Sequence, residues 1–337
     1  MTQRSVQLSD VARECGVSIS TVSYVLADSK HAQKFSEDTR QRVIETANRL
    51  GYVRNRAARS LSSGKTHTIA LLYTPPIDRF VEKLQLRAFN YFKERGYLLI
   101  SVPLARAHND TFPDLLRSGC CDGALLACDF DQTVELCRSL PEPPIPTVSL
   151  SGDQSLAHYG VVDVDERSAI ADVIARLIRS GRKRIAFVGQ HSSLADVRNE
   201  YRWRVFAETQ RSFGNEPTIL FHCNASIQDA AREATRVLQT AHEIPDAVYC
   251  SSDRVAIGTV LGAEHCGIQI PEQLSVVGSG NSAESVQFSP QLTTVGMKEE
   301  QIDLILAHFW NRLTGAPSDP FPLTIQWEVF SRQTTRF

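Results

Sequence analysis

The sequence has no long hydrophobic run and none of the short motifs that mark common hydrolases. No apolar stretch reaches the roughly 18 residues that a membrane-spanning helix needs, and residues 1–30 lack the apolar middle of a signal peptide. Neither GxSxG nor HExxH occurs. We therefore expect a cytoplasmic protein that has no membrane partner and is not an enzyme.

Two glycine-containing stretches fall short of nucleotide-binding motifs. Gly278-Ser279-Gly280 lacks the third glycine of a dinucleotide fingerprint. Gly64-Lys65-Thr66 is similar to the end of a phosphate-binding loop, but that loop needs a glycine where this chain has Arg59. Both motifs are rejected.

The eight cysteines form no CxxC pair, which argues against a disulfide framework and favours reduced thiols. His222-Cys223 and His265-Cys266 are tempting as metal ligands, but neither pair stands in a zinc-ligand spacing. Packing is the better reading of both, and we expect no metal and no cofactor.

Charge is distributed unevenly along the 337 residues, a length that suits two or three hydrophobic cores. The overall net charge is −2, but residues 1–65 hold eleven Lys and Arg against six Asp and Glu, a net charge of +5. The remainder therefore carries −7. A small basic segment on an acidic body suits a polyanionic partner for that segment alone.

Residues 8–26 read as two short helices around a tight turn. Apolar residues at positions 8, 11, 12 and 15 share one helical face, and Gly16 can take the positive φ that ends a helix. Ser18 can cap the next helix, whose buried face is Val22, Val25 and Leu26. This is the helix-turn-helix arrangement, whose second helix enters the DNA major groove.

A third helix is expected after Ser36, closed by Gly51. Glu37 and Asp38 suit the positive end of its dipole. Its predicted buried face consists of Val43, Ile44, Ala47 and Leu50. Residues 1–53 are thereby predicted to form a compact three-helix head.

Residues 8–62 include the stretches DVARECGVSISTVSYVL (10–26) and SEDTRQRVIETANRLGYVRNRAARSL (36–61), and they closely resemble the DNA-binding head of the LacI/GalR family of bacterial transcription regulators. A weaker resemblance runs to the C-terminus. It implies a regulator that binds a double-stranded DNA operator as a homodimer, since a palindromic operator requires two-fold symmetry.

By this resemblance, Ile19, Ser20 and Tyr24 contact bases. None is Arg, Asn or Gln, the side chains that pair bidentately with guanine or adenine. Ile19 can touch a thymine methyl group, and the two hydroxyls can each make single hydrogen bonds. Tyr24 stands where some relatives have Arg or His, so their operator sequences do not transfer.

Further residues match family positions that contact the DNA backbone and set register. They are Ser18, Thr21, Ser23, Ser36, Thr39, Arg40, Tyr52 and Asn55. Ser18 and Ser36 can equally be simple helix caps. The link 27–35 is about three residues longer than in relatives, and is expected to be a solvated loop; its Lys30, His31 and Lys34 could alternatively reach phosphates.

Residues 54–66 are expected to form a hinge helix and linker. The resemblance implies that residues 55–61 fold when two copies meet in the minor groove, with Ala58 and Leu61 there and Leu61 wedged between base steps. An ordinary linker role for Leu61 is the alternative.

The body, residues 67–337, contains a weak internal repeat with an offset near 120 residues. Residues 69–72, 98–102, 122–126 and 148–150 are echoed by 185–188, 218–221, 246–249 and 275–277, with helical stretches between them. Alternating strands and helices predict α/β lobes, each with a doubly wound parallel sheet.

The resemblance identifies these lobes as periplasmic-binding-protein-like, with three chain crossings near Asp163, residues 291–295 and residues 323–327. The first lobe is expected at about 67–163 plus 295–323, and the second at about 164–291 plus 327–337. Ligands of such sheets bind beyond the carboxyl ends of the strands, so the space between the lobes is the expected pocket.

Five residues match effector-site positions of the family: Phe80, Asp129, Arg202, Asn224 and Asp253. A surface ion pair is the alternative for Arg202, and a helix cap for Asp253. Relatives commonly carry Gly-Tyr-Asp-Asn where this chain has Gly278-Ser279-Gly280-Asn281, so the acid that holds sugar hydroxyls in them is absent.

We therefore predict a DNA-binding transcription regulator, acting as a repressor, that is controlled by a small-molecule effector, a sugar or related metabolite. The effector would shift the population between lobe arrangements and so change DNA affinity. The alternative is a solute-binding protein without a DNA role, which needs an export signal and leaves the basic head unused.

Overall fold

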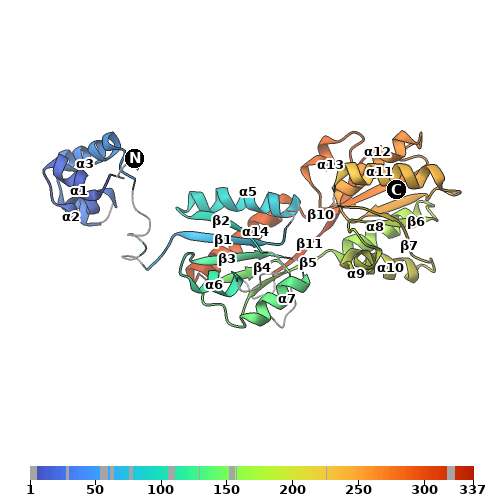
Figure 1. Cartoon of the computed structure of the whole chain (residues 1–337), viewed down its shortest axis with the longest axis horizontal. Coiled ribbons are helices and arrows are strands. Elements are labelled where there is room, and N and C mark those ends of the chain that lie inside the picture. The colour runs from blue at the N-terminus through green and yellow to red at the C-terminus, as the bar shows by residue number, and fades with distance from the viewer. Residues whose placement is uncertain are drawn as a thin grey trace. The chain divides into compact units, whose positions relative to one another are not determined.

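The computed structural model describes residues 6–27, 30–53, 60, 64–75, 79–104, 111–128, 130–151, 156, 158–224, 226–316 and 323–337. The chain divides into two compact units, Met1–Thr66 and His67–Phe337, which we call the head and the body (Figure 1).

The described part of the head is a small helical unit around one hydrophobic core. Its elements are α1 (Leu8–Cys15), α2 (Ile19–Leu26), the 3₁₀ helix η1 (Lys30–Lys34) and α3 (Glu37–Leu50). Val11, Val22 and Val43, one from each α-helix, are fully buried in its centre. Gly16 and Gly51 end α1 and α3 with φ of 66° and 68°, the left-handed conformation that favours glycine.

Two expectations for the head are wrong in detail. Ile44 is 41% exposed, and Thr46 occupies the buried position beside Ala47 instead. The reason is the helical period: Val43, Thr46 and Ala47 face the core, and Ile44 lies 100° away from Val43. The link between α2 and α3 is not simply a solvated loop, because η1 buries Ala32.

The first lobe of the body is built on a parallel sheet that has six strands in its described part. Their order is β11-β5-β4-β3-β1-β2. The strands are β1 (Thr68–Tyr73), β2 (Leu98–Pro103), β3 (Gly123–Ala127), β4 (Thr147–Ser149), β5 (Gly160–Asp165) and β11 (Leu323–Gln326). The accompanying helices are α5 (Arg79–Glu94), α6 (Thr111–Arg117), α7 (Phe130–Ser139) and α14 (Glu299–Thr314).

The second lobe repeats this plan, with the order β12-β10-β9-β8-β6-β7 among its described strands and only β12 antiparallel. Its strands are β6 (Ile185–Gly189), β7 (Thr218–His222), β8 (Ala247–Cys250), β9 (Ser275–Ser279), β10 (Thr293–Gly296) and β12 (Glu328–Phe330). Its helices are α8 (Arg167–Arg179), α9 (Leu194–Asn199), α10 (Tyr201–Ser212), α11 (Ile227–Thr240), α12 (Asp253–His265) and α13 (Ala283–Gln287).

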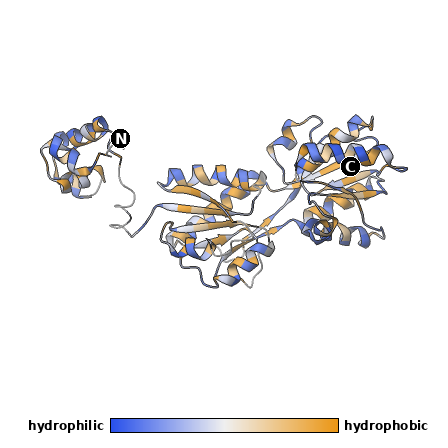
Figure 2. Ribbon diagram, in the orientation of Figure 1, coloured by the Kyte–Doolittle hydropathy of each residue, from blue (hydrophilic) through white to orange (hydrophobic). Residues whose placement is uncertain are grey.

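Both sheets are covered on both faces, as the near-continuous apolar strands predicted. Along β1, Ile69 and Leu71 enter one hydrophobic cluster, and Ala70 and Leu72 enter another. Figure 2 shows strands that are largely hydrophobic beside helices that alternate between polar and apolar residues. Among the helices that the structure describes, none combines the length and hydropathy of a membrane span.

The chain crosses between the lobes three times. It leaves the first lobe after β5, which ends at Asp165, returns after β10, and crosses again at Trp327 between β11 and β12. The first lobe was expected to end at about residue 163 and to resume at about residue 295. Instead, β5 continues to Asp165, and β10 lies wholly in the second sheet. The apolar pattern of the sequence did not show to which of the two lobes the residues next to each crossing belong.

Candidate DNA-binding and effector sites

The outward face of α2 displays the three residues expected to contact bases. Ile19 and Tyr24 are 52% and 40% exposed, and Ser20 is also exposed. Their neighbours Val22 and Val25 are buried in the head core, which fixes the helix with this face outward. An exposed isoleucine and tyrosine on a helix of a basic unit are available for contacts in a DNA groove.

Tyr24 stacks on His31 of η1, with ring centroids 5.0 Å apart and planes 23° from parallel. The lengthened link therefore contributes a ring that lies against one of the expected base-reading side chains. Because a stacked partner limits the rotamers open to Tyr24, the link affects the face that α2 presents.

The residues expected at the DNA backbone occupy three kinds of position. Ser18 and Ser36 are both helix caps, accepting hydrogen bonds from the backbone N–H groups of Thr21 and Thr39 at 3.1 and 3.3 Å. Ser23 is exposed, whereas Tyr52 is half-buried against the head core. Arg40 forms an ion pair with Glu37 one turn earlier on α3. Three other residues expected at the DNA, Asn55, Ala58 and Leu61, lie outside the described residues.

The carboxyl ends of the strands in both lobes face the chain crossings. β5 and β10 run parallel to their neighbours, and the chain leaves each of them at its carboxyl end for the other lobe. The loops after the parallel strands of each sheet must therefore lie on the side of the other lobe. This is where open α/β sheets bind ligands.

Arg202, in the first turn of α10, is held in this region by three contacts. Its Nε and Nη2 donate to the two Glu166 carboxylate oxygens at 2.8 and 3.1 Å, and Nη1 donates to the Ser251 carbonyl at 2.7 Å. The guanidinium also lies 4.9 Å from the ring centroid of Trp327. Burial lowers the pKa of Arg202, but the Glu166 carboxylate outweighs this and raises the pKa overall. Arg202 thus belongs to a partly buried ion pair, with its side chain 21% and that of Glu166 19% exposed, rather than to the surface pair considered from the sequence.

A second buried carboxylate, Glu200, lies beside this ion pair. Its side chain is about nine-tenths buried at the start of α10, with the His191 Nε2 atom 3.6 Å from Oε2. Burial raises the pKa of Glu200 to about 7, and Arg202 opposes that rise. A carboxyl group with this pKa exchanges protons near neutrality and gains from a ligand that donates a hydrogen bond.

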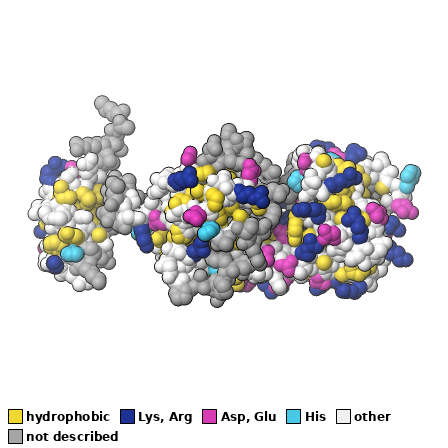
Figure 3. All heavy atoms as spheres, turned by 90° about the horizontal axis from the view of Figure 1, so that it is seen from below, with side chains coloured by type: hydrophobic (Ala, Val, Ile, Leu, Met, Phe, Trp, Pro, Cys, Tyr) yellow, Lys and Arg dark blue, Asp and Glu magenta, His cyan; other side chains and the backbone are white. Residues whose placement is uncertain are grey.

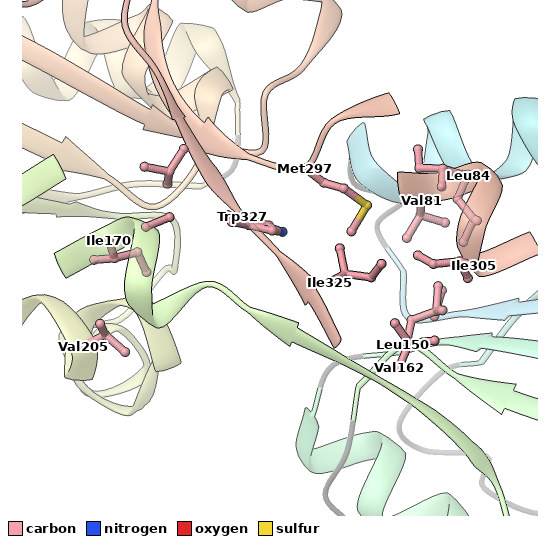
Figure 4. Packing of buried hydrophobic residues seen from close by; sticks show 14 of the residues in the cluster. Val81, Leu84, Leu150, Val162, Ile170, Val205, Met297, Ile305, Ile325 and Trp327 are labelled. Carbon is pink, nitrogen blue, oxygen red and sulfur yellow. The ribbon is translucent and has the colours of Figure 1, made fainter. Parts of the chain in front are cut away.

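Phe80 lies in the first turn of α5, at the carboxyl end of the first sheet. It packs against a hydrophobic cluster that contains Val81, Met297 and Trp327. In Figure 4, Trp327 lies between Ile325 and Val162 of the first lobe and Ile170 of the second. Phe80 and Arg202 thus belong to opposite sides of one crossing region. Asp129, the other effector-site residue expected in the first lobe, lies outside the described residues.

Asp253, for which an effector contact or a helix cap was expected, is buried and bonded to groups of its own lobe. Asp253 is only 2% exposed, and its carboxylate accepts hydrogen bonds from the Ser282 backbone N–H at 2.6 Å and the Thr294 hydroxyl at 2.5 Å. Burial raises its pKa, opposed by those bonds. The side chain that caps α12 is Ser252, not Asp253. Asp253 thus ties the loop after β9 to β10.

Asn224 lies away from the Arg202 cluster. It follows β7, the edge strand of the second sheet, and its amide donates to Asp229 at 2.8 Å. It lines an open groove of about 500 Å³ with His222 and Arg232, a groove that Arg202 and Phe80 do not reach. The strand order explains this separation, because β7 is the strand farthest from the crossings.

Gly280 has a φ of 122°, a conformation that residues with a side chain rarely adopt. Relatives commonly have an acid at this position. The backbone conformation of Gly280 disfavours aspartate or any other residue with a side chain there.

Sequence reasoning missed Glu166, Glu200, Ser251 and Trp327. Each stands at a strand end, a helix start or a crossing, but they come from four separate segments, and only the fold brings them to Arg202. Among the described residues, no group of three or more His, Cys, Asp or Glu side chains could hold a metal ion.

The chain combines a helix-turn-helix head with a two-lobed α/β body. This combination defines a class of DNA-binding regulators whose effector unit resembles a periplasmic binding protein. Residues 7–55 match the family model for bacterial regulatory proteins of the lacI family, and residues 174–335 match the model for a periplasmic binding protein-like domain. The chain belongs to the LacI family. It is a DNA-binding transcription regulator and not an enzyme.

Individual relatives agree with this assignment. The chain is 28% identical over 294 residues to catabolite control protein A of Priestia megaterium, covering 86% of this chain and 87% of the relative. The lac repressor dimer bound to operator and the anti-inducer ONPF superposes with a TM-score of 0.79 at 19% identity, covering 98% and 99% of the two chains. The regulator CelR in complex with cellobiose gives 0.63 at 24%, with the same coverage. The family match leaves the solute-binding alternative without support.

Proposed function

We propose that the protein binds a palindromic DNA operator as a homodimer and represses transcription under the control of a small-molecule effector held between the lobes. The observation that carries this proposal is the face of α2, where Ile19, Ser20 and Tyr24 are exposed on a unit of net charge +5. In the proposal these three side chains contact bases, and the capped starts of α2 and α3 contact phosphates.

An exposed apolar surface on the body supports the homodimer. Leu86 and Phe89 of α5 are 65% and 43% exposed, three residues apart on one helical face, and Leu304 of the neighbouring α14 is 55% exposed. Large exposed apolar groups on adjacent helices mark association surfaces. The lac repressor, which shares this fold, is described as a dimer on its operator. Elsewhere on the body, Figure 3 shows charges of both signs intermixed.

The contacts between the lobes support control by an effector. The hydrophobic cluster around Trp327 continues from Leu84 in the first lobe to Val205 in the second. Lys83 of α5 also donates to the Asn281 carbonyl of the second lobe at 2.5 Å. A ligand that binds one arrangement of these contacts better than another shifts the population between them. CelR, which is similar in fold, was solved with cellobiose, so we propose a sugar or related metabolite.

Selection from a random DNA library tests the DNA-binding part of this proposal. The purified full chain is expected to enrich sites with two-fold symmetry and half-site centres about 10 base pairs apart, because a two-fold dimer places two α2 helices one DNA turn apart. The Tyr24→Ala variant should lose the preference at one base pair in each half-site. Its control is Tyr201→Ala, which removes a similarly exposed tyrosine from the body and should select the wild-type site. Enrichment of asymmetric sites, or of none, would contradict the proposal.

A further inference from the structure

The link between α2 and α3, which is longer than in relatives, is a folded part of the head. Its 3₁₀ helix η1 buries Ala32, which is 2% exposed, and the Phe35 backbone N–H donates to the Ala32 carbonyl at 3.1 Å. Phe35 also packs against the head core. These contacts anchor η1 on the head and leave the side chains of His31, Gln33 and Lys34 exposed.

His31 lies against Tyr24, a side chain of the α2 face proposed to contact bases. The two ring centroids are 5.0 Å apart and the ring planes 23° from parallel, a stacked geometry in which aromatic rings attract each other. Tyr24 is still 40% exposed, so the pair lies at the surface of the head and leaves the phenol accessible. Because Ala32 is buried beside it, His31 is a held partner rather than a second mobile surface group.

The stack restricts a side chain that would otherwise change orientation. In a helix the χ1 angle near +60° is rare, and the two remaining wells direct a tyrosine ring to different places on the surface. Only an orientation that places Tyr24 face to face with His31 gains the stacking energy. The population of Tyr24 is therefore shifted toward that orientation before DNA is present.

The residue types on the reading face make the orientation of Tyr24 important. Ile19, Ser20 and Tyr24 include no Arg, Asn or Gln, so none of them forms the bidentate pair that identifies a base by itself. A single hydrogen bond requires its donor within a narrow range of distance and angle. A hydroxyl held in one place meets that requirement at one base edge, whereas a mobile hydroxyl adapts to several. Base discrimination by Tyr24 therefore depends on what holds its ring.

We propose that His31 is a positioning residue for base recognition, whose ring holds Tyr24 in one orientation so that the lengthened link sets the base preference of the α2 face. This inference rests on the base contact of Tyr24 in the proposed function. His31 acts through Tyr24 and makes no base contact of its own. The stack also lowers the ordering cost of binding, because Tyr24 is already restrained in the free head.

A phosphate contact is the competing role for His31. Such a contact sets register without reading sequence, so it strengthens binding to all DNA alike and steepens the dependence on salt. The geometry favours the positioning role, because one face of the imidazole ring already lies on Tyr24. Lys34, which is exposed on the same η1 and carries a compact positive charge, is the better phosphate ligand.

Two substitutions of His31 in the full chain separate these roles, once the preferred DNA site of the wild type has been selected. His31→Ala removes the ring and should lower affinity for that site about fivefold, the effect of losing one aromatic pair, with affinity for unrelated DNA within twofold of wild type. In a repeated selection it should relax the preference at the base pair that Tyr24→Ala also relaxes. His31→Phe keeps a stacking ring and removes both ring nitrogens, so it should retain the wild-type affinity and preference.

Combination with Tyr24→Ala shows whether His31 acts through Tyr24. Once the phenol ring is absent, adding His31→Ala should change neither affinity nor base preference further, because residues that act as one unit are not additive. Gln33→Ala is the matched control. Gln33 is exposed on the same η1, and this variant should select the wild-type site with wild-type affinity.

Three results would overturn the role of His31: an unchanged base preference in His31→Ala, a loss in His31→Phe equal to that in His31→Ala, or additive losses in the double variant. Equal weakening on selected and unrelated DNA, with a shallower salt dependence, would assign His31 to a phosphate instead. A wild type that selects a symmetric site while position 31 has no influence refutes only this inference. A wild type that selects no site refutes the proposed function, and this inference falls with it.

Discussion

Arg202→Ala is expected to lower the free energy of unfolding of the body by about 3 kcal/mol, the lower end of the cost of removing one partner of a buried ion pair, because both side chains here are about one-fifth exposed. Glu166 would lose both of its charge-assisted bonds, the Ser251 carbonyl would lose its donor, and Glu200 would lose the cation that limits its pKa. For a unit of this size that is a fall of about 10 °C in unfolding temperature, measurable by calorimetry.

Arg167→Ala is the matched control, because Arg167 pairs with Glu208 at 2.7 Å while both side chains remain more than half exposed. An exposed pair contributes about 0–1 kcal/mol, so this variant should unfold close to wild type. Adding Glu166→Gln to Arg202→Ala should recover part of the lost stability, since it removes the uncompensated charge. Equal losses in the two single arginine variants would contradict the buried ion pair.

Arg202→Ala should also affect the response to effector and the affinity for DNA differently. Without Arg202, Glu166 and the Ser251 carbonyl lose their common partner, so we expect no response to effector, with effector-free DNA affinity within a few-fold of wild type. Retention of the full response would place the effector elsewhere in the body.

Leu61→Ala is expected to reduce affinity for the selected operator about 100-fold, some 2.7 kcal/mol. The resemblance to the family places Leu61 between base steps in the minor groove, where an apolar wedge opens and bends the duplex. Affinity for unrelated DNA should fall only a few-fold, because phosphate contacts dominate nonspecific binding. Fluorescence anisotropy with the two DNAs measures both values.

Val53→Ala provides the comparison for Leu61. Val53 is 83% exposed near the end of the head, and removing its apolar side chain should change neither affinity by more than about twofold. If Leu61→Ala weakens both DNAs equally, Leu61 is an ordinary linker residue and the wedge assignment fails.

The head and the two sheets could be predicted because their signals are local. The spacing of Val11, Cys15 and Val22, with Gly16 between the helices, specified two helices and their turn, and the core confirms that pattern. Continuous apolar runs likewise predicted strands that are buried on both faces. The sequence pattern misplaced Ile44 because an apolar residue beside the core stripe looks the same as one within it.

The region proposed to hold the effector was less predictable because it is assembled from distant segments. Arg202 was identified from a family position, but its partner Glu166 is 36 residues earlier in the chain. Asp253 had the residue type and strand-end position of a ligand contact, yet the backbone of Ser282 and the hydroxyl of Thr294 occupy its oxygens. Whether a polar side chain at a strand end is available to a ligand depends on such non-local bonds.

The salt dependence of binding to the selected DNA site tests most directly whether the basic head carries DNA recognition. Each phosphate contact releases counterions, so the logarithm of the binding constant should fall linearly and steeply with the logarithm of salt concentration. With several phosphate contacts per head, the affinity should drop by about 1,000-fold or more between 50 and 200 mM salt. A nearly flat response over that range would contradict DNA binding by the head.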